Sequence, residues 1–149
     1  MFIFSRRDRL SGVVAFTLME VLIAIVIAGV IASLAIPNYF HMVEQARENE
    51  AKVNLQVIRT GEKVFALNHN GDFFGPGANP PVGDINKTLN IDISTEFFDI
   101  VSMTAFNGAV PKTFKAIAQR NKKNGGDGSH QFVINQDGVI TEDFAAGIP

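Results

Sequence analysis

The side chains that could carry out acid–base, nucleophilic or metal chemistry are scattered along this sequence. His41, His69 and His130 share no metal-ligand spacing, and Ser, His and Asp combinations occur only as isolated residues. The Gly-rich stretches lack the strand, Lys and helix that surround a phosphate-binding loop, so turns account for them better. Without Cys, the chain can form no disulfide, no Cys zinc site and no c-type haem attachment. We therefore predict neither an enzyme nor a cofactor.

Composition and charge limit which other classes of protein fit this sequence. A chain of 149 residues with 46% hydrophobic and 19% charged residues has room for one compact domain and one long apolar element. The net charge is only −2, and Lys and Arg are scattered rather than gathered in a basic stripe. The sequence therefore gives no indication of a nucleic-acid partner.

The longest apolar run could cross a membrane. A helix of roughly 20 residues, at about 1.5 Å per residue, spans roughly 30 Å, which is the hydrocarbon thickness of a bilayer. The run extends from Phe16 to Ile36, and its exceptions are Thr17, Glu20, Ser33 and the neutral Gly29. We therefore expect membrane lipid to surround this segment.

The residues before this run predict its orientation. Arg6, Arg7 and Arg9 outnumber the single Asp8, and an excess of Arg on one flank places that flank in the cytoplasm. The expected protein is a single-pass protein of the cytoplasmic (inner) membrane, with its N-terminus in the cytoplasm and the rest of the chain outside.

Two general interpretations of the N-terminal segment stay open. An ordinary secretory signal peptide would use the small residues of Ser33-Leu34-Ala35 at its cleavage site. Against it stand Glu20 at the head of the apolar run and an amphipathic pattern that continues past the cut. A plain membrane anchor explains the apolar residues and the Arg residues, but it leaves the order of residues 16–20 unexplained.

A third interpretation uses that order. Phe16-Thr17-Leu18-Met19-Glu20-Val21-Leu22-Ile23-Ala24 resembles the cleavage and methylation segment of type IV pilins and type II secretion pseudopilins. The resemblance extends to Gly29, Ile36-Pro37 and Tyr39. It implies that a prepilin peptidase and methyltransferase removes residues 1–15 as a basic leader, cuts between Ala15 and Phe16, and methylates the new amino group of Phe16.

The resemblance also assigns roles further along the segment. It implies that Glu20 stays embedded in the membrane and acts with Phe16 in subunit assembly, and that the helix between Gly29 and Pro37 can melt and stretch in filaments. Most members of the family have Gly just before the cut, where this chain has Ala15. Gly12 lies in the wrong register to Glu20, so the predicted cut remains at Ala15/Phe16.

Glu20 has a local structural explanation as well. Thr17-x-x-Glu20 before an apolar run fits a capping box, in which the two side chains bind free N–H groups at a helix start. Cap and assembly roles can apply at different stages. Gly29 and Pro37 likewise have simpler explanations as a packing Gly and a helix kink.

The next segment, residues 38–68, has the pattern of an amphipathic helix. Apolar residues recur at intervals of three or four, with charged residues between them; this stripe contains Val43, Ala46, Val53, Val57, Val64 and Leu67. Leu55, Ile58 and Phe65 widen the stripe in its later half, which we expect to pack on the chain's own sheet. The earlier half can face neighbouring subunits. One long helix from Phe16 to about Asn68 is expected.

Residues 69–149 are expected to form a loop and an antiparallel sheet. Residues 71–84 contain four Gly and three Pro and are expected to be a loop, with a short helix near Ile85 to Leu89. Strand-like runs separated by Gly-containing turns follow at 97–105, 113–120, 131–134 and 139–141. The inward face of this meander should contain Phe98, Ile100, Phe114, Ala116, Ala118, Phe132 and Ile134.

The predicted fold is therefore α+β. A long N-terminal helix, transmembrane over residues 16–37 and amphipathic over 38–68, packs on a small antiparallel meander, as in the roll that the family resemblance implies. Asp127, Asn135 and Asp137 could offer oxygens to Ca²⁺, as some pseudopilins do in their last loop, but no EF-hand spacing is present. Hairpin turns are the simpler explanation, so no metal site is predicted.

The expected function is architectural. The resemblance implies a subunit that waits in the membrane, meets an inner-membrane assembly platform, and joins other copies in a helical filament outside the cell or in the periplasm. A type II secretion pseudopilin is the alternative within the family, since the chain lacks the Cys pair that closes the C-terminal loop of many pilus subunits. A membrane-anchored extracellular binding domain that never polymerises is the alternative from another class.

Overall fold

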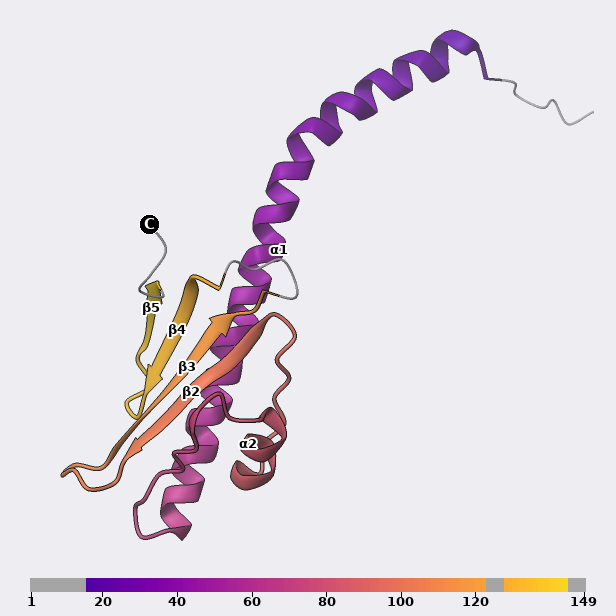
Figure 1. The fold of residues 1–149 in the computed structure, drawn as a ribbon. Coiled ribbons are helices and arrows are strands. Elements are labelled where there is room, and N and C mark those ends of the chain that lie inside the picture. The colour runs from indigo at the N-terminus through magenta and orange to yellow at the C-terminus, as the bar shows by residue number, and fades with distance from the viewer. Residues whose placement is uncertain (1–15, 123–127, 145–149) are drawn as a thin grey trace, which may run out of the picture. The chain divides into compact units, whose positions relative to one another are not determined.

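The computed structural model describes residues 16–122 and 128–144 and divides the chain into two units, residues 1–41 and 42–149. Helices and strands follow one another along the chain as shown in Figure 1. In order they are α1 (Leu18–Asn68), β1 (Gly77–Ala78), α2 (Val82–Leu89), β2 (Phe98–Phe106), β3 (Thr113–Arg120), β4 (His130–Asn135) and β5 (Ile140–Phe144). The predicted α+β class is confirmed.

Helix α1 confirms the long N-terminal helix that the sequence predicted. It runs for 51 residues, and it includes Pro37 without ending there. The loss of the backbone donor at Pro37 removes one helical hydrogen bond and does not end the helix. The first unit contains the apolar part of α1, and the second unit contains its amphipathic part together with the sheet; we call the second unit the head.

The sheet of the head is an antiparallel meander, as expected, but it has five strands. Its order is β1-β2-β3-β4-β5, so each strand pairs with its neighbours in sequence. Strand β1 and the first turn of α2 lie in the segment 71–84, which we expected to be loop throughout. Strand β1 has only two residues, which is too short for a strand pattern to be recognised in the sequence. Helix α2 starts after Pro81, whose backbone is extended, at φ −61° and ψ 131°.

The inward face of the sheet is the face that the sequence predicted. All seven expected residues are buried, with exposed fractions of 4% or less. A β-bulge between Ile100 and Ser102 shifts the alternation by one residue, so Met103 joins the core in place of Ser102. A strand's two-residue period predicts its faces well wherever no bulge interrupts it.

The face of α1 that meets the sheet differs from the predicted stripe. The buried positions of α1 are Ala51, Leu55, Ile58, Gly61 and Glu62, whereas Val53, Val64 and Leu67 are exposed by 60%, 51% and 85%. The prediction was right for Leu55 and Ile58 and wrong for those three residues. Two apolar stripes run side by side on this helix, and the sheet packs on the one with the larger Leu and Ile side chains.

Small residues on the buried stripe bring α1 close to its neighbours. A Cβ atom at Gly61 would lie 2.9 Å from both Leu89 Cβ and Ile91 Cγ2, which is too close for any larger residue without movement. This contact brings the end of α2 and the chain after it against the side of α1. The head thus has one core, formed by α1, α2 and the inner face of the sheet.

The two stripes of α1 lead to a matched pair of substitutions. Leu55→Ala removes a fully buried side chain from the core and should lower the free energy of unfolding of the head by about 2 to 5 kcal/mol. Val53→Ala trims the exposed stripe two residues away and should change it by about 0.5 kcal/mol or less. Urea denaturation of the full-length chain in detergent, followed by circular dichroism, measures both. Equal losses would contradict the assignment of the buried face.

Candidate functional site

The helix α1 begins at the residues that the sequence singled out for processing. Phe16 precedes the helix and is 75% exposed, while Ala15 lies outside the described residues. Thr17 caps the helix, because its Oγ1 accepts a hydrogen bond from the backbone N–H of Glu20 at 3.2 Å. The Thr17 half of the predicted capping box is therefore confirmed.

The carboxylate of Glu20 does not complete that box. Its side chain is exposed, and within the described part of the chain it has no hydrogen bond or ion pair. A carboxylate at the start of an apolar helix is thus left available for a partner from outside the chain. The cap accounts for Thr17 but not for the charge of Glu20.

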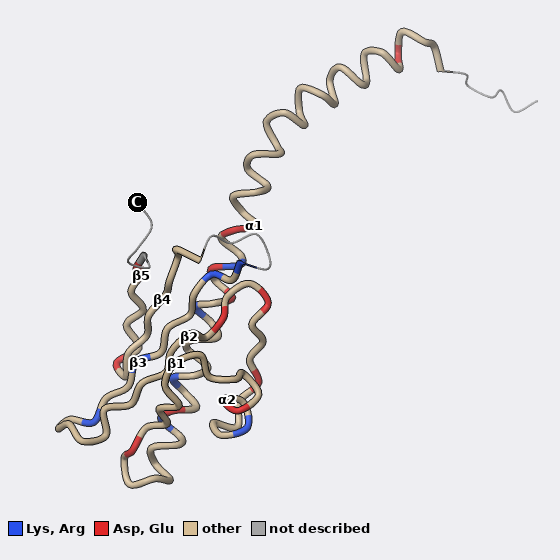
Figure 2. Tube along the Cα trace, viewed as in Figure 1, with Lys and Arg blue, Asp and Glu red and all other residues tan. Residues whose placement is uncertain are grey.

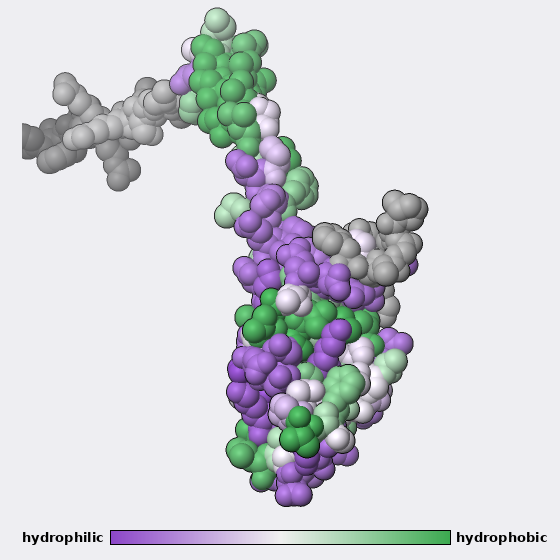
Figure 3. Space-filling model, turned by 90° about the vertical axis from the view of Figure 1, so that its left-hand side faces the viewer, coloured by the Kyte–Doolittle hydropathy of each residue, from purple (hydrophilic) through white to green (hydrophobic). Residues whose placement is uncertain are grey.

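The first part of α1 presents an apolar surface that no described residue covers. It is long and apolar enough to cross a membrane by length and composition, and its most apolar window has none of its residues buried. Figure 3 shows the hydrophobic residues gathered over this stretch, and Figure 2 shows how few charges it has. The exposed apolar side chains include Leu22, Ile25, Val26, Val30 and Ile31. Such a surface requires lipid or other protein around it.

Gly29 and Pro37 both lie within this apolar part of the helix. A Cβ atom at Gly29 would meet no other atom within 4 Å, so the chain itself gives no packing reason for a Gly there. Pro37 lacks the backbone N–H that would continue the hydrogen-bond ladder of α1. These two positions carry the predicted flexibility, which stays a prediction.

A second apolar surface lies on the part of α1 that belongs to the head. The exposed stripe of α1 lines a groove of about 610 Å³, with Ile91 and Ile140 contributing from the segments that flank the helix. The residues of α1 in this groove are Asn49, Lys52, Val53, Gln56, Val57 and Thr60. Val53, Val57, Thr60, Val64 and Leu67 recur every three or four residues, which is the spacing of a seam for another helix.

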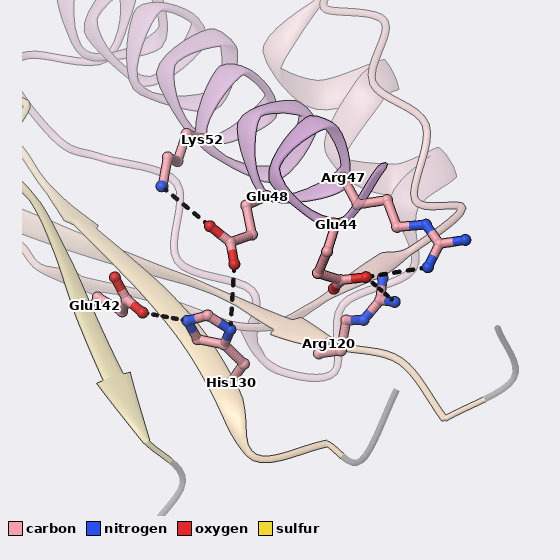
Figure 4. Close-up of polar contacts among 7 residues, drawn as sticks. All are labelled: Glu44, Arg47, Glu48, Lys52, Arg120, His130 and Glu142. Carbon is pink, nitrogen blue, oxygen red and sulfur yellow. Dashed lines mark hydrogen bonds and ion pairs between the residues drawn. The ribbon is translucent and has the colours of Figure 1, made fainter. Parts of the chain in front are cut away.

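Charged side chains link the start of this helical segment to the sheet (Figure 4). Arg120 of β3 is only 6% exposed and pairs with Glu44 of α1 at 3.1 Å, and Arg47 pairs with the same carboxylate at 3.1 Å. Both guanidinium groups lie over the ring of Phe97, at 5.8 Å for Arg120 and 4.7 Å for Arg47. Arg120 Nη1 is buried without a hydrogen-bond partner. Sequence reasoning missed the pairing of Arg120 with Glu44, because the two residues are 76 positions apart.

A histidine joins three elements next to this cluster. In Figure 4, His130 of β4 lies between Glu48 of α1 and Glu142 of β5. Its Nε2 bonds Glu142 Oε1, and its Nδ1 lies 3.8 Å from Glu48 Oε1. Lys52 lies 3.7 Å from the other oxygen of Glu48 and over the ring of Phe132. These contacts fix the edge strand β5 to the sheet and the sheet to α1.

The three Ca²⁺ candidates are only partly described. Asp127 lies outside the described residues, so the set is not tested. Asn135 acts in the β4–β5 turn, where its Oδ1 accepts hydrogen bonds from the backbone N–H groups of Asp137 and Val139, both at 3.1 Å. Among the residues that the structure describes, no group of three or more His, Asp or Glu side chains could hold a metal ion.

A side chain of α1 already provides a cation at this turn. Arg59 donates from Nε to the carbonyl oxygen of Gln136 and from Nη2 to that of Asp137, each at 3.0 Å. Gln56 donates to the carbonyl of Gly138 at 3.3 Å. The guanidinium thus binds carbonyl oxygens of the kind that Ca²⁺ would use, and it holds the turn against the helix.

The chain is 40% identical over 50 residues to the type IV major pilin protein PilA of Myxococcus xanthus, a match that covers 34% of this chain and 23% of the pilin. It is 34% identical over 65 residues to the type II secretion system core protein G of Aeromonas hydrophila, covering 44% of this chain and 43% of the relative.

The resemblance to the type IV pilin and type II secretion pseudopilin family is confirmed. The chain matches less than half the length of either relative. No family model matches it, and no solved structure gives a significant match. The long apolar helix and the antiparallel sheet are consistent with the pilin fold.

Arg120 is buried and Arg47 is only partly buried, so replacing each with Ala should lower the free energy of unfolding by a different amount. Arg120→Ala removes a buried guanidinium from Glu44 and two aromatic rings, and it should lower the free energy of unfolding by about 1 to 3 kcal/mol. Arg47→Ala removes a partly buried partner of the same carboxylate and should cost less, about 1 kcal/mol. Denaturant titration of the full-length variants measures both losses. A loss for Arg47→Ala as large as that for Arg120→Ala would contradict the structural role of Arg120.

Proposed function

We propose that this chain is a structural subunit of a type IV pilus-like filament, and not an enzyme. The observation that carries the proposal is the start of α1, where a capped apolar helix that no described residue covers bears one carboxylate, Glu20, without a partner among the described residues. Similarity to a pilin and to a secretion core protein supports self-association through such a helix. The chain is divided by role into a removed leader (1–15), a transmembrane or filament-core helix (16–37), an amphipathic helix (38–68) and a head segment (69–149).

Maturation is the first step of the proposed function. A prepilin peptidase on the cytoplasmic side cuts between Ala15 and Phe16 and methylates the amino group of Phe16. The exposure of Phe16 and its place just before the helix support access by such an enzyme. The Arg residues of the leader keep the N-terminal side in the cytoplasm, so the head lies outside the membrane.

Cleavage creates the partner that Glu20 lacks. The new amino group at Phe16 carries a positive charge in an apolar setting, and a neighbouring subunit's carboxylate can bind it by a charge-assisted hydrogen bond. In a low dielectric such a pair is much stronger than in water. Because Phe16 and Glu20 are fixed at the start of α1, pairing between copies sets the axial offset of one subunit from the next.

The exposed stripe of the head supplies a second contact between copies. A groove lined by Val53, Val57, Ile91 and Ile140 fits an apolar helix, and the first part of α1 is an apolar helix without cover. Two different surfaces of one chain then meet, so the contact does not close on itself and grows into a helical filament. Melting between Gly29 and Pro37 would let the filament stretch without loss of these contacts.

Before assembly the protein is held in the inner membrane by lipid around residues 16–37. An assembly platform in that membrane extracts it, and the finished filament lies outside the cell or in the periplasm. The similarity to a type II secretion protein over 65 residues favours one second candidate, a periplasmic pseudopilus. Sheared surface filaments containing this chain would identify a pilus, and their absence together with impaired secretion would identify a pseudopilus.

Processing has a direct readout in the mass of the protein. The intact mass of the membrane-extracted chain should equal that of residues 16–149 plus one methyl group, because the peptidase removes the leader and methylates Phe16. A chain that starts at Ile36 would establish a secretory signal peptide instead. An uncut chain would support a plain membrane anchor that never polymerises.

Substitution of Glu20 separates assembly from membrane insertion. Glu20→Ala should leave insertion intact or improved, since a charge in the apolar helix costs up to about 2.5 to 3.5 kcal/mol at the bilayer centre and less near the interface. It should abolish filaments, because the amino group of the next subunit loses its partner. The test compares membrane content with the yield of sheared filaments.

Thr17→Ala is the control for the role of the cap. It removes the Oγ1 acceptor of the Glu20 N–H but keeps the carboxylate, so filaments should still form. Normal filaments from Glu20→Ala, loss of that variant from the membrane, or an equal loss of filaments in Thr17→Ala would each contradict the proposed pairing.

A further inference from the structure

Glu62 is a buried carboxylate in the head that filament assembly does not explain. Its side chain is fully buried, at 0% exposure, on the face of α1 that packs on the sheet. Its Oε2 accepts a hydrogen bond from the backbone N–H of Phe74 at 2.8 Å. Its Oε1 is buried and has no hydrogen-bond partner. A negative charge held by a single donor away from water is unfavourable, so the neutral acid suits this position better.

The segment that contains Phe74 is bound firmly on its sheet side. We call residues 72–79 the strap; it lies between α1 and α2 in the chain and includes β1. Asn107, in the turn after β2, holds Phe73 twice, with Oδ1 accepting from its N–H at 2.8 Å and Nδ2 donating to its carbonyl at 2.9 Å. Strand β1 pairs with β2, and the N–H of Asn79 donates to the carbonyl of Val101 at 2.8 Å.

On the helix side the strap has one hydrogen bond. Among the bonds described for residues 73–79, only the one from Phe74 to Glu62 reaches α1. A ring contact accompanies it, since Phe74 lies 5.8 Å from Phe65 between centroids. The state of the Glu62 carboxyl therefore decides how well the strap is joined to the helix.

We propose that Glu62 is a pH-sensitive latch, whose neutral carboxyl holds the strap closed against α1 and whose ionisation loosens it. The neutral acid leaves no charge in the core and still accepts the hydrogen bond from Phe74. The ionised form leaves a charged oxygen, Oε1, without a donor, and opening of the strap lets water reach it.

The direction of the effect follows from the pKa of Glu62. Burial raises this pKa from its ordinary value of 4.5 to about 7, and the hydrogen bond from Phe74 opposes part of the rise. In the open form water surrounds the carboxyl and its pKa returns toward 4.5. The closed form thus binds the proton more tightly, so a rise in pH from 4.5 through 7 favours opening. Above about 7 the effect is complete.

Other charged groups near the strap have their own partners or are exposed. Asp72 of the strap pairs with Lys112 at 2.7 Å. On α1, Arg59 binds the β4–β5 turn, and Lys63 is exposed. His69, after the end of α1, stacks on the ring of Phe65 at 3.8 Å and is therefore the titratable group to separate from Glu62 by experiment.

Hydrogen exchange of the full-length chain in detergent micelles tests the latch. The protection factor of the strap amide at Phe74, corrected for intrinsic exchange, should fall between pH 5 and pH 8.5. The fall over this pH range should be at least tenfold and at most about 70-fold, the limit set by the two pKa values. Amides of the sheet interior at Ala116 and Phe132 should keep their protection and show that the head stays folded.

Two variants test whether ionisation of Glu62 causes the fall in strap protection. Glu62→Gln keeps an acceptor for Phe74 but cannot ionise, so its strap protection should be the same at both pH values. His69→Gln should retain the full fall of the wild type. A flat wild-type profile, a fall that persists in Glu62→Gln, or a fall abolished by His69→Gln would each overturn the proposal. If Glu62→Gln does not fold, the wild type and His69→Gln still decide it.

The latch itself does not depend on filament assembly, but its biological consequence rests on the proposed function. A head outside the cytoplasm experiences the pH of its surroundings, and a loosened strap would expose the Phe65 and Phe74 rings there. Failure of Glu20→Ala to block filaments would leave the exchange result intact, so the two proposals fail separately.

Discussion

The apolar first part of α1 is the constraint on which the rest of this molecule depends. A fully exposed Leu, Ile or Val forgoes about 1.5 to 3 kcal/mol relative to burial, and many such side chains are uncovered here. Packing among the described residues does not offset this cost, because they bury no residue of the most apolar stretch. Such a surface needs lipid or other protein around it. In the proposed function lipid covers it first and other copies of the chain cover it later.

The same helix organises the head by presenting two different faces. One face, with Leu55 and Ile58, forms the core with the sheet, and small residues such as Gly61 let neighbouring segments approach. The other face, with the exposed Val53 and the partly buried Val57, lines a groove. Arg59 and Arg120 then join the helix to the β4–β5 turn and to β3. These contacts attach the sheet to the part of α1 that belongs to the head.

Predictions from the sequence were correct where the alternation of apolar and polar residues was long and uninterrupted. The sheet interior was predicted residue by residue because alternation decides which way each side chain of a strand points. The same reasoning chose the wrong stripe on α1, since two apolar stripes of similar length run along it and only packing shows which one meets the sheet.

Glu62 was missed because a carboxylate on an amphipathic helix is expected to be exposed, and its donor, Phe74, belongs to a loop. The pairing of Glu44 with Arg120 has no sequence signal, since it depends on the register of β3 against the helix. The start of α1 could be predicted in more detail, because cap, charge and apolar run lie next to one another in the chain.

Thiol labelling within sheared filaments tests the central claim, that α1 lies inside an assembly of copies, most directly. The chain has no Cys, so single Cys variants can be labelled with a membrane-impermeant maleimide at one known position. Val53→Cys lies on the exposed stripe of α1, and Lys115→Cys lies on the outward side of β3 as a matched control. Both should react in detergent-solubilised monomers, and only Lys115→Cys should react fully in filaments. Equal labelling of Val53→Cys in both states would contradict an assembly built around α1.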